Sequence, residues 1–140
     1  MFSVADPSTW TLLVTDNEHD VQQIVMFTCD AYEVQCQTAS SGRECLQQLE
    51  QYTPDILLLD IQMPDLSGWE VLRIIRAKAN YTGLVIALTA HAMTGDRERI
   101  LAAGFDGYFP KPLSPRHMIQ DLQTLLTQRA KSSANFHSVQ

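Results

Sequence analysis

Five short apolar runs, each followed by a segment with helical spacing of its apolar residues, restrict this chain to very few folds. The strands that these runs predict are 11–15, 33–38, 56–59, 84–88 and 108–109. The predicted helices include 18–30, 94–103 and a last one from Ser114 to about Arg129. A strand followed by a helix, repeated five times, predicts an α/β fold: a doubly wound parallel sheet with right-handed crossovers and helices on both faces.

The strands differ in how much of their surface they are predicted to bury. The run 56–59 is apolar throughout, which is typical of a central parallel strand that is covered on both faces. Residues 33–38 alternate between apolar and polar, which predicts an edge strand with one covered face. Helix limits carry local signals as well. Ser41 and Glu44 form a capping-box pattern, and Gly104 follows the fourth helix where a left-handed residue commonly ends one.

Composition narrows the class of partner. The 140 residues carry a formal net charge of -6 with scattered basic residues, which argues against a nucleic-acid surface because such surfaces cluster Lys and Arg. No apolar run approaches the roughly 20 residues that cross a bilayer, and no signal peptide is recognised. We therefore expect a soluble, cytoplasmic protein that binds neither membrane nor nucleic acid. It should have one compact domain at 10–129, an N-terminal extension at 1–9 and a flexible tail at 130–140.

Four of the predicted strands end in a polar side chain that could take part in a reaction. These residues are Asp16, Asp60, Thr89 and Lys111. Parallel strands bring their carboxyl ends to one edge of a sheet, where ligands bind. Adjacent carboxylates repel unless a cation lies between them, and Mg2+ commonly binds one or two carboxylates with waters and phosphate oxygens. The pattern predicts a magnesium-dependent pocket in which Asp60 attacks a phosphoryl group while Lys111 and Thr89 offset its charge.

A resemblance to a known family rests on four segments. They are LLVTDNE at 12–18, LLLDIQMPDLSG at 57–68, ALTAHAM at 87–93 and GDRERILAAGFDGYFPKP at 95–112. In this order they resemble the response-regulator receiver domain of two-component signalling, including receivers attached to hybrid histidine kinases. The resemblance covers about residues 10–129 and implies a flavodoxin-like fold with strand order 2-1-3-4-5. It also implies a signalling domain that is no ordinary enzyme, because it catalyses only its own phosphorylation and slow autodephosphorylation.

The resemblance implies a role for each residue near the phosphoryl group. Asp60 is the expected phosphoacceptor, which takes its phosphoryl group from a histidine kinase or a histidine phosphotransfer protein. Mg2+ is expected to bind Asp16, Asp60 and the backbone carbonyl of Gln62. Lys111 is expected to form a salt bridge with the phosphoryl group, and the Lys111–Pro112 peptide bond is expected to be cis.

Four further implied roles concern switching and lifetime. Thr89 also stabilises the phosphoryl group, and Thr89 and Tyr108 form the expected switch pair. When they move, the surface around the last strand and the last two helices changes, and this surface is expected to bind a downstream protein. Gln62 and His91 occupy the positions that tune the lifetime of the phosphoryl group. The resemblance leaves a homodimer open.

One position departs from the family pattern. Its members usually have two acidic residues after the first strand, where this chain has Thr15 and Asp16. We align Thr15 with the missing first acid; the alternative register places Asn17 at the position of the direct metal ligand. In either register, the predicted pocket has one carboxylate fewer than usual. The first acid typically contacts the metal through water, so the Thr15 hydroxyl is predicted to lower Mg2+ affinity without abolishing it.

Three other functions share parts of this pattern. An electron carrier with flavin mononucleotide would share the sheet order, but it needs a phosphate-cradling loop where residues 15–18 are acidic. A phosphatase of the haloacid-dehalogenase type needs a second acid two residues after its nucleophile, where this chain has Gln62. A degenerate receiver would keep the fold and serve, because of Thr15, as a phosphorylation-independent protein-binding module. Treatment with acetyl phosphate and Mg2+ separates this last alternative from a phosphoacceptor.

Overall fold

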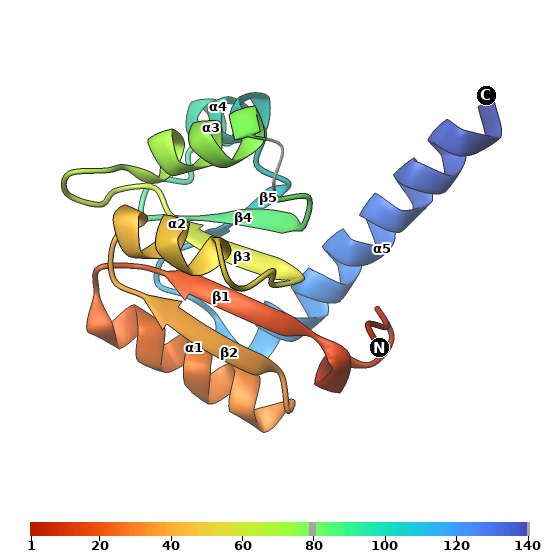
Figure 1. Cartoon of the computed structure of the whole chain (residues 1–140), viewed down its shortest axis with the longest axis horizontal. Coiled ribbons are helices and arrows are strands. Elements are labelled where there is room, and N and C mark those ends of the chain that lie inside the picture. The colour runs from red at the N-terminus through yellow and green to blue at the C-terminus, as the bar shows by residue number, and fades with distance from the viewer. Residues whose placement is uncertain (79–80, 140) are drawn as a thin grey trace.

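A computed structural model describes residues 1–78 and 81–139 and shows a central sheet with helices on both faces (Figure 1). The strands are β1 (Thr11–Thr15), β2 (Gln35–Ala39), β3 (Ile56–Asp60), β4 (Leu84–Thr89) and β5 (Gly107–Pro110). The helices are α1 (His19–Ala31), α2 (Gly42–Leu49), α3 (Gly68–Lys78), α4 (Thr94–Ala103) and α5 (Pro115–Val139). All pairs are parallel in the order β2-β1-β3-β4-β5. The predicted fold and the edge position of its second strand are confirmed.

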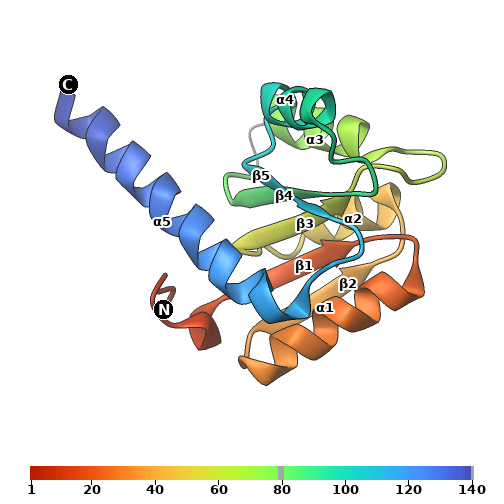
Figure 2. The same ribbon diagram turned by 180° about the vertical axis from the view of Figure 1, so that it is seen from behind.

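Side chains alternate across the sheet and build a separate apolar core on each face. In β3, Ile56 and Leu58 pack with α1 and α5, whereas Leu57 and Leu59 pack with α2, α3 and α4. All five residues of this strand are buried, as predicted for a central parallel strand. Figures 1 and 2 show α1 and α5 on one side of the sheet and α3 and α4 on the other.

Local hydrogen bonds and backbone angles explain two of the helix limits. Ser41 Oγ accepts the N–H of Glu44 at 3.1 Å and so caps α2, as the capping-box pattern predicts. The Glu44 carboxylate accepts the N–H of Ser40 at 3.0 Å, one residue before the position that the pattern implies. Further along the chain, α4 ends at Ala103 and is followed by Gly104, whose φ of 111° lies in the left-handed region that favours glycine.

The last helix is longer than predicted. It begins at Pro115 and continues to Val139, through all but the last residue of the segment 130–140 that the sequence predicts as a flexible tail. Residue 140 lies outside the described residues. The apolar stripe ends at Leu126, but good helix formers such as Ala130 and Lys131 continue the helix beyond the sheet (Figure 1). Within the described ranges, no helix combines the length and apolar character needed to span a bilayer.

The segment before β1 packs against the body of the domain. Trp10 is fully buried, and its Nε1 donates a hydrogen bond to the Ser3 carbonyl at 2.8 Å. Gln123 in α5 donates to the Val4 carbonyl at 3.2 Å. A short 3-10 helix at Pro7–Thr9 leads into β1. The N-terminal extension therefore lies beside α5, at the end of the sheet opposite the carboxyl ends of the strands.

Gly68, the first residue of α3, allows this helix to begin against the end of β3. A Cβ at this position would overlap the Asp60 carbonyl oxygen and lie 2.8 Å from Ile61 Cα. We expect Gly68→Ala to lower the free energy of unfolding by about 1–3 kcal/mol, because these backbone neighbours must shift. Urea unfolding measures the change. Gly95→Ala is the matched control, since a Cβ at exposed Gly95 meets nothing within 4 Å. Equal stability of the two variants would contradict this packing.

Candidate functional site

The register of the sheet places Asp16 and Asp60 side by side. Thr15 in β1 pairs with Leu59 in β3, so the residue that follows on each strand lies at the same level. Both carboxylates are almost completely buried, with 0% of Asp16 and 2% of Asp60 exposed. Burying two acids together is costly unless a cation offsets their charge.

The Lys111 ammonium lies among three carboxylates. Its Nζ is 2.9 Å from Asp16 Oδ2, 3.2 Å from Glu18 Oε1 and 3.3 Å from Asp60 Oδ1. Only 14% of the lysine side chain is exposed, so these ion pairs are poorly screened by solvent. The Lys111–Pro112 peptide bond is cis, as predicted.

The pKa values of Asp60 and Lys111 are both raised, but for different reasons. Burial, followed by repulsion from Asp16, raises the pKa of Asp60 to about 6, although Lys111 and the Gln62 N–H favour its ionised form. The Gln62 N–H lies 3.1 Å from Asp60 Oδ1. Burial alone lowers the pKa of Lys111, but hydrogen bonding and attraction from its carboxylate neighbours outweigh burial and raise this pKa overall. The ammonium is therefore held charged in the pocket.

The pocket has the ligands and charge that suit a divalent cation. Asp16, Glu18 and Asp60 each offer a carboxylate oxygen, and these atoms lie within 4.8 Å of one another. With the Lys111 ammonium, the three carboxylates carry a net charge of about -2, which one divalent cation neutralises. Asp60 Oδ2 makes no hydrogen bond in the described part of the chain, and Asp16 Oδ2 has only its ion pair with Lys111. Hard oxygen ligands of this kind fit Mg2+.

Glu18 is the site residue that the sequence analysis did not single out. It occupies the N-cap position of α1, yet its side chain makes no capping hydrogen bond and instead pairs with Lys111. The prediction that the pocket has one carboxylate fewer than the family usually has stays a prediction, because Glu18 does not occupy the position of the missing acid. The available signal was an acid two residues beyond Asp16, at the same edge of the sheet.

Thr15 is fully buried at the end of β1, and its hydroxyl has no hydrogen-bond partner among the described residues. Alternation along the strand places its side chain on the same face of the sheet as Leu13, which packs with α2 and α3. Asp16 contacts Lys111, whereas Asn17 is exposed. This geometry favours the alignment of Thr15 with the family's first acid over the alternative register.

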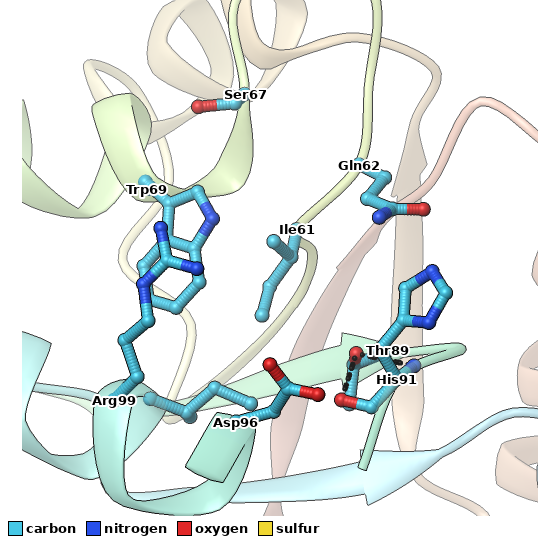
Figure 3. A pocket seen from close by; sticks show the side chains of 9 residues that line it. Ile61, Gln62, Ser67, Trp69, Thr89, His91, Asp96 and Arg99 are labelled. Carbon is cyan, nitrogen blue, oxygen red and sulfur yellow. Dashed lines mark hydrogen bonds between the residues drawn. The ribbon is translucent and has the colours of Figure 1, made fainter. Parts of the chain in front are cut away.

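Gln62, Thr89 and His91 line a cleft of about 450 Å³ beside the carboxylates (Figure 3). The Thr89 hydroxyl donates to the His91 carbonyl at 3.0 Å and accepts the His91 N–H at 2.9 Å. On the opposite wall, the Arg99 guanidinium lies 4.9 Å from the centre of the Trp69 ring. The predicted site residues thus form two adjoining groups, one in the acidic pocket and one in this cleft. The acidic group is Asp16, Asp60 and Lys111, and the hydrogen bond from the Gln62 N–H to Asp60 joins it to the cleft.

Tyr108, the other half of the predicted switch pair, lines a different cavity. This cavity of about 630 Å³ lies between α4, β5 and α5, and it includes Leu101 and Leu125. The Arg97 guanidinium lies 5.7 Å from the centre of the half-buried tyrosine ring. A contact of this kind favours the present position of the ring by about 0.5–1 kcal/mol.

A parallel sheet in this order, with an acidic pocket and a lysine at its carboxyl edge, defines a signalling domain of the response-regulator class. The family model of the response regulator receiver domain matches residues 12–123. The chain therefore belongs to the response-regulator receiver family, and it is a receiver domain of two-component signalling. Such domains are signalling modules and not enzymes in the usual sense.

Named relatives support the same assignment. The polar-differentiation response regulator DivK of Brucella ovis is 34% identical over 116 residues, which cover 82% of this chain and 94% of DivK. The chemotaxis response regulator CheY4 of Vibrio cholerae superposes with a TM-score of 0.77 at 25% identity, covering 83% of this chain and 98% of CheY4. The receiver domain of Francisella response regulator 1452 gives a TM-score of 0.76 at 28% identity, with 86% and 98% coverage.

Proposed function

We propose that this receiver takes a phosphoryl group on Asp60 in a magnesium-dependent reaction. The observation that carries the proposal is the asymmetry of the Asp60 carboxylate. Its Oδ1 is held by Lys111 and by the Gln62 N–H, whereas its buried Oδ2 makes no hydrogen bond. One oxygen is therefore fixed, and the other keeps its lone pairs available for attack on phosphorus.

The proposed donor is the phosphohistidine of a histidine kinase or of a histidine phosphotransfer protein. Asp60 Oδ2 forms a bond to phosphorus while the phosphorus–nitrogen bond of the donor breaks. The electron pair of the broken bond stays on the imidazole nitrogen, which takes up a proton. We assign this function to residues 10–129. A cytoplasmic location goes with the proposal, because a histidine kinase draws its phosphoryl group from ATP.

Asp16, Asp60 and the Gln62 backbone carbonyl would hold Mg2+ in this scheme. When bound, the cation offsets the negative charge on the transferred phosphoryl oxygens. Lys111 is already positioned against Asp60 and donates to a phosphoryl oxygen bound there. The Thr15 hydroxyl, which is buried without a partner, holds the position of the family's first acid and leaves the affinity for Mg2+ lower.

Switching in this proposal requires two contacts to change. Thr89 must release the His91 backbone before its hydroxyl can turn to the phosphoryl group. Tyr108 must leave Arg97 before its ring can turn inward. Both movements alter the surface of α4, β5 and α5, where Leu101 is 51% exposed, and we propose this surface as the site of a downstream protein.

The lifetime of the phosphoryl group would depend on the mouth of the cleft. Gln62 and His91 are both exposed there, and Figure 3 shows them on the same side of the cleft, across from Trp69 and Arg99. In this proposal their side chains control the access of water to an acyl phosphate on Asp60.

Intact-mass measurement after treatment with acetyl phosphate tests the proposal. The wild-type chain should gain the mass of one phosphoryl group with Mg2+ present and none with a chelator, because the cation is needed to offset charge. Asp60→Asn should gain none. Asp65→Asn, which changes an exposed acid of the same loop, is the control and should gain as much as wild type. No gain on wild type would favour the phosphorylation-independent binding module.

A further inference from the structure

Two of the three cysteines of the chain lie together on the face of the sheet that α1 covers. Cys29 is buried in the last turn of α1, and Cys36 in β2 packs against the same apolar core. Both are free thiols. We infer that they form a peroxide-sensitive pair, in which Cys36 reacts first and Cys29 closes an intramolecular disulfide. The inference goes beyond the proposed function, because neither thiol belongs to the acidic pocket.

The backbone brings the two cysteine side chains to the same place. The chain turns directly after α1, so that the helix lies against β2 (Figures 1 and 2), and the Val34 N–H donates to the Cys29 carbonyl at 2.9 Å. Val34 and Cys36 are two residues apart in an extended segment, so their side chains point to the same face of the sheet. Val34 belongs to the core that contains Cys29. Cys36 therefore faces Cys29, and a hydrogen bond joins the two thiols.

The two thiols differ in their accessibility and acidity. Cys36 is partly exposed on an edge strand, whereas Cys29 is fully buried. The hydrogen bond from Cys29 favours the Cys36 thiolate and lowers the pKa of Cys36, although burial opposes this effect. The same hydrogen bond, together with burial, raises the pKa of Cys29. An accessible thiol of lowered pKa beside a second cysteine is the usual arrangement at an oxidation-sensitive site.

Hydrogen peroxide is the oxidant that this arrangement suits. The Cys36 thiolate attacks one peroxide oxygen, the oxygen–oxygen bond breaks, and the departing hydroxide takes up a proton to become water. The product is a sulfenic acid on Cys36. The Cys29 thiol then attacks this sulfur and gives up its proton, while the sulfur–oxygen bond breaks and a second water leaves. Two thiols and one peroxide thus give one disulfide and two waters, with the sulfurs oxidised and the peroxide oxygens reduced.

The simpler explanation is that all three cysteines serve only as small apolar side chains of the core. Free cysteines are commonly buried in this role. Cys45 in α2 fits it, because this residue is fully buried and burial raises the pKa of its thiol to about 11. The simpler explanation predicts that the three thiols resist peroxide equally. Cys45 is therefore an internal control for the other two.

Counting the free thiols of the full, folded chain after exposure to hydrogen peroxide tests the inference. The peroxide is removed with catalase, and the chain is then unfolded and labelled with N-ethylmaleimide. Intact mass should show three maleimides on the reduced chain and one on the oxidised chain, because Cys29 and Cys36 are consumed and Cys45 is not. Peptide mapping should find the disulfide between Cys29 and Cys36, and dithiothreitol should restore all three labels.

Two variants and one rate separate the thiol pair from general oxidation. Cys45→Ala should still form the disulfide and bind no maleimide after peroxide, because its pair is intact. Cys36→Ser should keep both of its thiols and bind two maleimides, because Cys29 is buried and has lost the partner that reacts first. In the reduced, folded wild-type chain, maleimide should label Cys36 at least about tenfold faster than Cys45, since Cys36 is more exposed and has the lower pKa.

Several results would overturn the inference. They are three maleimides on wild type after peroxide, a disulfide between two chains in place of the internal one, and oxidation of Cys45 as fast as that of Cys36. Conversion of Cys36 to a sulfinic acid while Cys29 stays free would also overturn it. None of these results bears on phosphoryl transfer to Asp60, so the inference and the proposed function fail separately.

Discussion

Lys111→Met is expected to destabilise the Mg2+-free protein by about 3–5 kcal/mol at neutral pH, the usual cost of removing one partner of a buried ion pair. The substitution keeps most of the side-chain volume but leaves three neighbouring carboxylates without their ammonium. Two of these carboxylates are almost fully buried, so water cannot replace the lost partner. Urea unfolding in a chelator measures the loss, and saturating Mg2+ should recover a large part of it.

Two comparisons make this result specific to the pocket. Lys78→Met removes an exposed lysine at the end of α3 and should change stability by less than about 0.5 kcal/mol. Asp60→Asn added to Lys111→Met should restore part of the stability, because it removes one of the repelling charges. A Lys111→Met protein as stable as Lys78→Met, or one that gains nothing from Mg2+, would contradict the electrostatic description of the pocket.

Asp60→Asn is expected to stabilise the Mg2+-free protein at neutral pH, even though it removes the proposed phosphoacceptor. Burial and repulsion from Asp16 raise the pKa of Asp60 from 3.8 to about 6. About two pKa units correspond to a penalty of about 3 kcal/mol for ionising this buried group in the folded state. An amide carries no such penalty, so chemical unfolding in a chelator should show a gain approaching this value.

The gain should depend on pH in a defined direction. Because the folded-state pKa is raised, the folded protein binds the Asp60 proton more tightly than the unfolded chain does. This tighter proton binding contributes fully to the stability of the folded protein below pH 3.8, and the contribution is lost as the pH rises through about 6. The stability difference between Asp60→Asn and wild type should therefore be large at neutral pH and small near pH 3.8.

Mg2+ and a neighbouring acid provide the controls for this prediction. Adding Mg2+ at neutral pH should raise the stability of wild type more than that of Asp60→Asn, because the cation offsets the charge that the variant lacks. Asp65→Asn, in the exposed loop after β3, should leave stability nearly unchanged at both pH values. An Asp60→Asn protein that is less stable than wild type in chelator at neutral pH would disprove the proposed charge repulsion.

Much of the fold follows from local patterns in the sequence. The continuous apolar run of β3 and the alternation of β2 identified a central and an edge strand, because each pattern reflects which faces are covered. The parallel order then placed Asp16, Asp60 and Lys111 at one edge. Their meeting required no knowledge of distant contacts beyond the rule that parallel strands end together.

The features that sequence could not predict depend on three-dimensional contacts or on their absence. Glu18 is exposed and lies at a helix start, so its sequence pattern indicates a solvated side chain, and only the fold brings Lys111 to it. The sequence of α5 beyond Arg129 has no apolar stripe, and the ribbon of this part of the helix extends beyond the sheet in Figure 1. Periodicity reports packing, and it therefore misses a helix that continues on local propensity alone.

The most direct test of the account is to locate the phosphoryl group on the chain. Borohydride reduces an acyl phosphate to an alcohol, so a phosphorylated aspartate is converted to homoserine and can be found by peptide mass spectrometry. After treatment with acetyl phosphate and Mg2+, the account predicts homoserine at position 60 alone, and none when Mg2+ is removed. Modification at Asp16 or Glu18 in place of Asp60, or no modification at all, would contradict it.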